Sequence, residues 1–306
     1  MKNIPTDSFI TSLVQDTFAE LPYLEVLKLL KEKQLTLKSE EIYTKYKDER
    51  FSVSDLLSQS IFIDYFMSTE LFEYVNIGGE ESTDNLPTWD NNKEYSLFID
   101  PIDGGPAYLS GGNDWGIMIG VCNKMGENIY SWFTTSDAKV IESKKIIELQ
   151  SGSFAERAQK GKNFSIDLFA YNEIELVEGA KKEITKLAGE KIGLFLEYSS
   201  WPAALYAAHH LVIGNSAGLL WLPSITGKGF YPDYDCVFFD AIQKAGFKIK
   251  IARREVVVPE SEGKIAMIAV ASVYDDLELL WQAGINVLGD RFDVSWKIST
   301  DHLIII

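Results

Sequence analysis

The sequence predicts an α/β protein, α+β in its first half and α/β in its second. Three observations favour this class. Apolar residues recur at helical spacing up to Phe66, a hairpin pattern lies between positions 117 and 133, and strand-sized and helix-sized segments alternate after position 165. The 306 residues, 46% of them hydrophobic, are enough to bury a large core.

Two helices are predicted between Ser8 and Lys47, where apolar residues keep helical spacing and Pro22 interrupts them. A third helical pattern follows, with Ser52 or Ser54 as its cap and Asp55 in its first turn. The apolar side expected of this helix comprises Leu56, Leu57, Ile61, Ile63 and Phe66.

A strand is predicted from Tyr95 to Ile99. It is expected to stop at Asp100-Pro101, because proline lacks a backbone donor and restricts the residue before it. Gly104-Gly105-Pro106 then predicts a tight turn, with Pro106 at the first position of a helix. A strand, a turn and a helix start in this order are typical of a binding site.

The segments Ile117–Cys122 and Asn128–Phe133 flank a turn-like stretch and predict a hairpin in an antiparallel sheet. A polar stretch from Ser151 to Asp167 marks the expected boundary between two domains, residues 1–155 and 156–306. The alternating segments beyond it are Ser165–Ala170, Glu175–Leu187, Ile192–Leu196, Ala203–Ile213, Gly218–Leu222, Val237–Ala245, Phe247–Ile251, Ala266–Ala271 and Asp275–Ala283.

The charge of the chain restricts its partners. Lys and Arg number 29 and Asp and Glu 45, a net charge of −16, which disfavours nucleic acid and anionic membranes because both reward a basic surface. No apolar stretch has the length of a membrane span or a signal peptide, so a cytoplasmic protein is expected. An acidic protein with an anionic substrate needs a cation between the two.

Asp100 and Asp103 are the leading candidates for binding such a cation. They flank Pro101-Ile102 at the end of the predicted strand, where two carboxylates repel each other unless a cation bridges them. Mg²⁺ prefers carboxylate, water and phosphate oxygens. The backbone N–H groups of Gly104 and Gly105, ahead of a helix start, are suited to binding phosphate. The alternative is that the two acids merely cap the following turn.

Three motifs resemble the signatures of the inositol monophosphatase family in order and spacing. They are Gly79-Glu80-Glu81-Ser82, Asp100-Pro101-Ile102-Asp103-Gly104, and the segment from Tyr234-Asp235 through Ala245-Gly246. The likeness runs from about Lys45 to Val273. It implies a layered αβαβα sandwich of the sugar phosphatase type and a lithium-sensitive phosphatase with two or three Mg²⁺ ions. It also implies a small phosphorylated metabolite as substrate and a homodimer.

The resemblance assigns roles to individual positions. The metal ligands that it implies are Glu80, Asp100, the carbonyl of Ile102, Asp103 and Asp235. Asp55 and Glu80 are the residues that it assigns to catalysis, with Asp55 near a third ion and orienting the attacking water. Lys228 and Ser199 lie where the family contacts the substrate.

Gly105 departs from the family pattern, which generally has a threonine whose hydroxyl touches metal and helps to activate water. Loss of one such positioned group costs about 10²-fold or more in rate, and Pro106 removes a further amide from the anion site. Three hypotheses therefore stay open. The chain is an active phosphatase, a relative with impaired catalysis that binds a phosphometabolite, or a scaffold whose acids are surface charges.

Overall fold

The computed structural model describes residues 5–44, 50–143, 164–168, 174–189, 195–198, 211, 216–222, 238–254, 265–271, 273–289 and 296–299. These residues fall into two compact units, the first ending at Ser143 and the second comprising everything described from Phe164 onward. The boundary expected at residue 155 lies between them, outside the described residues.

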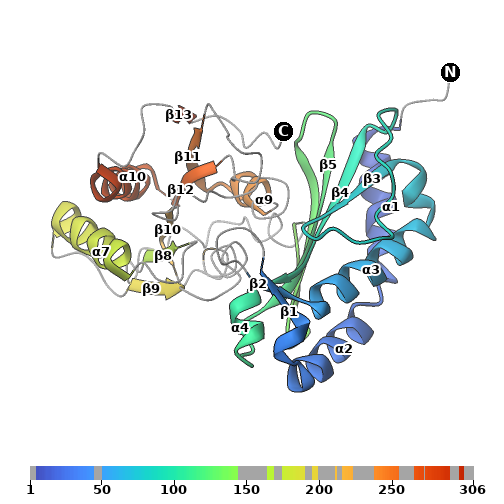
Figure 1. Ribbon diagram of the computed structural model, residues 1–306. Helices are drawn as coiled ribbons and strands as arrows, with labels where there is room; N and C mark the ends of the chain where they lie inside the picture. Colours follow the sequence, from blue (N-terminus) through green and yellow to red (C-terminus); the bar gives the residue numbers. More distant parts are fainter. Residues whose placement is uncertain are drawn as a thin grey trace. The chain divides into compact units, whose positions relative to one another are not determined.

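The first unit contains a five-stranded sheet (Figure 1). Its strands, in spatial order, are β3 (Val75–Gly79), β4 (Tyr95–Asp103), β5 (Gly116–Asn123), β6 (Asn128–Thr135) and β7 (Val140–Glu142). β3 runs parallel to β4, and every other neighbouring pair is antiparallel. The predicted hairpin is confirmed as β5 and β6, and Gly126 takes the positive φ of 75° that their connecting turn requires.

Helices α1 (Asp7–Ala19), α2 (Tyr23–Thr36) and α3 (Val53–Met67) accompany this sheet. They share one apolar core with the strands. The separation of α1 from α2 at Pro22 is confirmed, because Pro22 is the residue that precedes the first turn of α2. In the core, the Phe18 ring lies 5.4 Å from that of Phe66 and 5.2 Å from that of Tyr130.

Short elements link these helices to the sheet. A 3-10 turn, η1 (Ser39–Glu41), leads from α2 to a two-stranded antiparallel ribbon, β1 (Ile42–Thr44) and β2 (Arg50–Ser52), which ends where α3 begins. A second 3-10 turn, η3 (Glu70–Glu73), joins α3 to β3, and a five-residue helix, α4 (Gly105–Leu109), follows β4.

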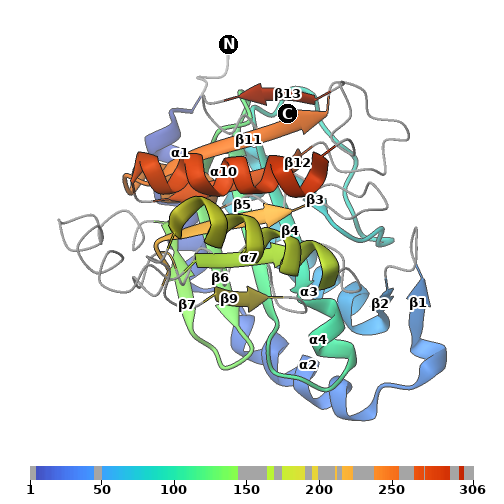
Figure 2. The ribbon, with the colours of Figure 1, turned by 90° about the vertical axis from the view of Figure 1, so that its left-hand side faces the viewer.

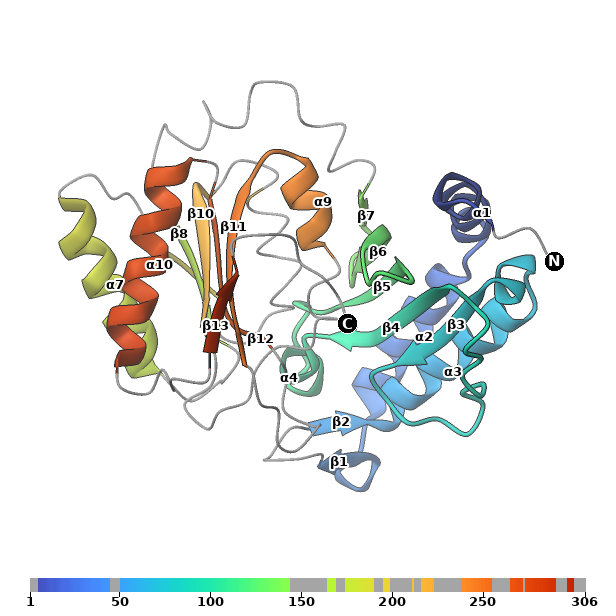
Figure 3. The ribbon, with the colours of Figure 1, turned by 90° about the horizontal axis from the view of Figure 1, so that it is seen from above.

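The second unit is built on a six-stranded mixed sheet. Its strands, in spatial order, are β13 (Trp296–Ser299), β11 (Lys248–Arg254), β12 (Ile265–Ala271), β10 (Gly218–Leu222), β8 (Phe164–Leu168) and β9 (Phe195–Tyr198). Helices α7 (Ile174–Ala188) and α10 (Tyr274–Leu288) lie side by side over one face (Figure 2). The short helix α9 (Phe239–Lys244) lies on the opposite face of this sheet (Figure 3), where the Phe239 ring stacks on that of Trp221 with a centroid distance of 5.7 Å.

The alternation predicted for the second half is confirmed where the structure describes it. The order β8, α7, β9, β10, α9, β11, β12, α10 matches the expected segments, with ends that differ by a few residues. The helix expected over Ala203–Ile213 lies outside the described residues except for Leu211. Strand β13 was not predicted. The sequence therefore determined a mixed α/β class correctly in both units.

Among the described helices, none combines the length and the apolar character that crossing a bilayer would require.

Candidate metal and phosphate site

Helix α3 buries polar residues in its first two turns. Ser54, Asp55, Ser58 and Gln59 are buried, and Phe62, Ile63 and Phe66 continue the same face. The apolar side predicted for this helix was therefore partly wrong, since Leu56, Leu57 and Ile61 are only half-buried. Buried polar atoms need partners, and Ser58 and Gln59 find them in two of the segments that the motifs single out.

Asp55 forms a capping box at the start of α3. Its Oδ2 accepts hydrogen bonds from the Ser52 backbone N–H at 2.7 Å and from the Ser52 hydroxyl at 2.8 Å. The Ser52 hydroxyl in turn accepts from the Ser54 backbone N–H at 3.2 Å. Of the two caps considered, Ser52 is the one used. The carboxylate thus stabilises the helix N-terminus, and its assignment to a catalytic water stays a prediction.

Glu80 follows the end of β3 and lies next to Asp100, which is inside the parallel strand β4. Gly79 of β3 pairs with Ile99 of β4, and the Glu80 backbone N–H extends the ladder by donating to the Ile99 carbonyl at 3.0 Å. Glu80 directly follows Gly79, and Asp100 directly follows Ile99. Neighbouring strands lie about 4.8 Å apart, so the pairing brings the first two predicted metal ligands together. Asp100 is buried, at 3% exposure, and Glu80 is half-buried.

A β-bulge separates Asp100 from Asp103. Asp100 pairs with Met118 and Asp103 with Gly116, so β4 has one more residue than β5 over this stretch. The predicted end of the strand at Asp100 was therefore wrong. The strand continues to Asp103 because the bulge takes Pro101, which has no N–H, out of the regular ladder. The Ser58 hydroxyl of α3 donates to the Pro101 carbonyl at 3.4 Å.

Gly104 and Gly105 connect this bulge to α4. Gly104 has φ of +91°, a left-handed conformation that L side chains rarely adopt. Gly105 is the first residue of α4 and Pro106 the second, one position later than predicted. A Cβ added at Gly105 would meet only the Arg50 carbonyl oxygen, at the ordinary contact distance of 3.6 Å. Gly104 is thus required by the backbone, whereas Gly105 is not.

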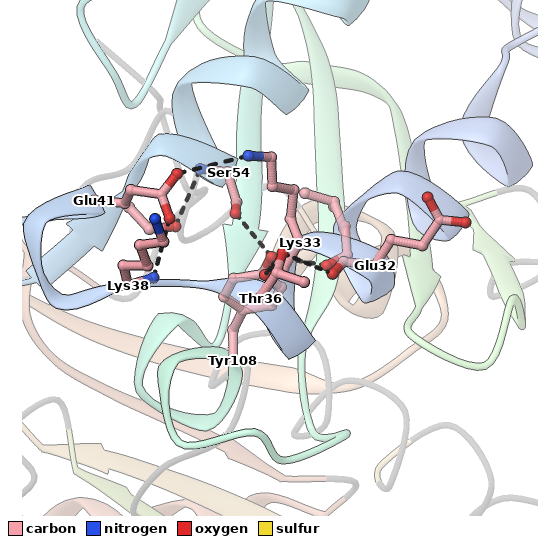
Figure 4. A network of polar contacts seen from close by, with 9 residues as sticks. Glu32, Lys33, Thr36, Lys38, Glu41, Ser54 and Tyr108 are labelled. Atoms are coloured by element: carbon pink, nitrogen blue, oxygen red, sulfur yellow. Dashed lines mark hydrogen bonds and ion pairs between the residues drawn. The ribbon is translucent and has the colours of Figure 1, made fainter.

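Helix α4 is held by buried hydrogen bonds from two other helices. The Tyr108 hydroxyl donates to the Leu30 carbonyl at 2.8 Å and is hydrogen-bonded to the Ser54 hydroxyl at 2.8 Å (Figure 4). Gln34 donates to the carbonyls of Tyr108 and Gly112, each at 2.8 Å. Burial raises the pKa of Tyr108 to about 12, and the charge of Asp55 adds to the rise. Tyr108 therefore stays neutral and anchors the turn.

Gln59 is a member of this region that the sequence analysis missed. Its side-chain amide pairs with the backbone of Glu81, donating to the Glu81 carbonyl at 2.5 Å and accepting from the Glu81 N–H at 2.9 Å. The sequence signal for Gln59 is its position four residues after Asp55, which places both residues on the same face of α3.

The structure assembles only part of the predicted site. Asp235, Lys228 and Ser199 lie outside the described residues. Within those residues, no three His, Cys, Asp or Glu side chains converge in a group able to hold a metal ion. Strand pairing brings Glu80 to Asp100, and Asp103 follows one bulge later. All of these donors, including the Ile102 carbonyl, are oxygens, which fit Mg²⁺ in type.

The fold is shared with phosphatases of known structure. Extragenic suppressor protein SuhB from Bartonella henselae has a TM-score of 0.64 at 12% identity, with 88% of this chain and 98% of that chain covered. The inositol monophosphatase of Thermotoga maritima has 0.58 at 14% identity, with 86% and 95% covered.

A third structure, an inositol monophosphatase/NADP phosphatase complexed with Mg²⁺ and phosphate, has a TM-score of 0.60 at 12% identity, with 94% of this chain and 98% of that chain covered. No protein-family model and no curated protein sequence matches the chain. The likeness is one of structure rather than of sequence, and it shows that this chain has the fold of the inositol monophosphatase-type phosphatases.

Proposed function

We propose that this protein is a Mg²⁺-dependent phosphatase that hydrolyses a small phosphate monoester of an inositol, a sugar or a nucleotide. The observation that carries the proposal is the pairing of β3 with β4, which places Glu80 next to Asp100 on neighbouring strands, with Asp103 across the bulge. A structural neighbour holding Mg²⁺ and phosphate supports the choice of metal and of ligand.

The proposed metal site has two or three ions. The residues that would hold them are Glu80, Asp100, the Ile102 carbonyl, Asp103 and Asp235. Bound Mg²⁺ supplies an activated water and neutralises the charge of the transferring phosphoryl group. A small phosphorylated metabolite is the proposed partner, and a homodimer the proposed assembly.

The chain's own groups would bind and orient the reactants. The backbone N–H groups of Gly104 and Gly105 are offered to phosphate oxygens by the turn before α4, which the left-handed φ of Gly104 makes possible. Asp55, held in the capping box, would orient the attacking water. Lys228 and Ser199 are the proposed contacts to the alcohol part of the substrate.

The test is phosphate release from a panel of phosphate monoesters with MgCl₂ or with EDTA. We expect hydrolysis that requires Mg²⁺ and falls by at least about 10²-fold in Asp103→Asn, because the substitution removes a ligand charge. Asp16→Asn is the matched control, since Asp16 is an exposed acid on α1 and its loss should leave the rate unchanged. A panel without Mg²⁺-dependent release contradicts the proposal.

A second candidate is a phosphometabolite-binding protein with impaired catalysis. Gly105 favours it, because the residue has no hydroxyl to position water, although a Cβ would fit at this position without a close contact. This candidate predicts Mg²⁺-dependent ligand binding in calorimetry without turnover. Rapid hydrolysis by the unaltered protein would exclude it.

A further inference from the structure

The buried amide of Gln59 connects α3 to the segment that carries Glu80. Gln59 is fully buried and forms a reciprocal pair with the Glu81 backbone, at 2.5 Å and 2.9 Å. The amide side chain both donates to and accepts from the backbone of one residue, and so satisfies both of its polar groups. The backbone of Glu81 is therefore fixed to the helix.

Gly79 provides the space for this amide. A Cβ added there would lie 2.3 Å from the Gln59 carboxamide carbon and oxygen, far inside van der Waals contact. Gly79 is not among the glycines with positive φ, so its backbone conformation is open to alanine, and the atoms nearest to the added Cβ all belong to the Gln59 amide. The glycine before Glu80 is thus required by Gln59 rather than by a turn.

Glu80 lies between two fixed points. Its own N–H donates to the Ile99 carbonyl of β4 at 3.0 Å, and the next residue is held by Gln59 of α3. This arrangement fixes the backbone of Glu80 next to that of Asp100 on the neighbouring strand, against the repulsion expected between two acids. Holding like charges together before a cation arrives is preorganisation, which strengthens cation binding.

We propose that Gln59 is a positioning residue, which fixes Glu80 beside Asp100 and so preorganises the cation site; the inference rests on the proposed function. Gln59 does not touch the cation in this scheme, and it acts only through the backbone of Glu81. Residues that orient metal ligands in this way typically change metal affinity about 10- to 100-fold when removed.

Asn76 offers a matched control in the same strand. Its side-chain amide forms the same reciprocal pair with the backbone of Asp90, donating at 3.0 Å and accepting at 2.8 Å, and its exposure is 4%. Asn76 lies three residues before Gly79, near the opposite end of β3. Loss of this pair removes equivalent hydrogen bonds without releasing Glu80.

The experiment measures MgCl₂ binding by isothermal titration calorimetry and the Tm in EDTA for wild type, Gln59→Ala and Asn76→Ala. We expect both variants to lower Tm, since each removes the two hydrogen bonds of a buried side-chain amide. Only Gln59→Ala should raise the Mg²⁺ Kd, by about tenfold or more. Equal Kd values for wild type and Gln59→Ala would overturn the inference and leave the proposed function intact.

Gly79→Ala tests the same contact from the other side, should Gln59→Ala fold poorly. We expect it to displace the Gln59 amide and raise the Mg²⁺ Kd as Gln59→Ala does. The double variant should bind no more weakly than either single variant, because both break one contact. Additive losses would contradict the shared mechanism. A wild-type protein that binds no Mg²⁺ would refute the metal site itself.

Discussion

Gly104 and Gly105 are adjacent glycines with different physical roles. Gly104 adopts φ of +91°, where a side chain is strained, while Gly105 has ordinary φ and open space for a Cβ. We therefore expect Gly104→Ala to lower the free energy of unfolding by about 1–2 kcal/mol and Gly105→Ala to leave it nearly unchanged. Urea unfolding of the two variants measures this difference, and equal losses of unfolding free energy would contradict the prediction.

Gly105→Thr is expected to raise the rate of phosphate ester hydrolysis. The added hydroxyl could help to position the attacking water, a contribution worth about 10²-fold in rate. A Cβ at this position meets only the Arg50 carbonyl oxygen, at the ordinary contact distance of 3.6 Å. The measurement is kcat with MgCl₂ for wild type, Gly105→Thr and Gly105→Val, which has the same shape without the hydroxyl. An identical gain in the valine variant would show that the hydroxyl is not responsible.

Tyr108 makes the stability of the first unit depend on pH in the alkaline range. Its pKa is raised to about 12 in the folded protein by burial, against 10.0 for the free side chain. The unfolded chain therefore loses this proton first, and stability is lost as pH rises from about 10 toward 12. Over this pH range the stability of Tyr108→Phe should fall less steeply than that of wild type, and the two slopes should differ by up to about 1.4 kcal/mol per pH unit.

Urea unfolding from pH 8 to pH 11 checks this dependence. Burial also raises the pKa values of Tyr95 and Tyr130, so the decisive quantity is the difference in slope between Tyr108→Phe and wild type. At pH 8 the variant should already be less stable by about 1–3 kcal/mol, because the Leu30 carbonyl loses its buried donor. Parallel curves would contradict the assignment.

At the scale of the element, the start of α3 depends on one serine. The Ser52 hydroxyl accepts from the Ser54 N–H and donates to Asp55, both buried contacts. We expect Ser52→Ala to lower the free energy of unfolding by about 1 kcal/mol. Ser68→Ala is the control, since Ser68 ends the same helix with an exposed hydroxyl. This substitution should lower the free energy of unfolding by only a few tenths of a kcal/mol. Chemical unfolding measures both, and a larger loss at Ser68 would contradict the cap.

The β5–β6 hairpin, strand β4 and helix α3 illustrate what pattern alone predicts about an element. The hairpin of β5 and β6 followed from alternating residues around a turn, because pairing there is local. The extent of β4 did not follow from the sequence pattern. Pro101 predicts the end of a strand unless the pairing with the partner strand is known. The buried side of α3 was likewise misjudged, since its polar residues face partners distant in sequence.

At the scale of the whole molecule, Mg²⁺ should stabilise the folded chain. A cation bound only by the folded state adds about 2.7 kcal/mol per site at a free concentration one hundred times Kd. We expect MgCl₂ to raise Tm, EDTA to reverse the rise, and Asp103→Asn to show a smaller rise. The net charge of −16 makes any salt mildly stabilising, so NaCl of equal ionic strength is the control. An equal rise with NaCl would contradict specific binding.

The sequence by itself determined the mixed α/β class, most elements in their order, and the Asp100 to Gly104 segment as the candidate site, because periodicity and turn chemistry are local properties. Only the tertiary structure decided that Glu80 lies next to Asp100 and that Gln59 holds Glu81, 22 residues further along the chain. Strand register and burial depend on contacts between distant segments, and no local pattern specifies them.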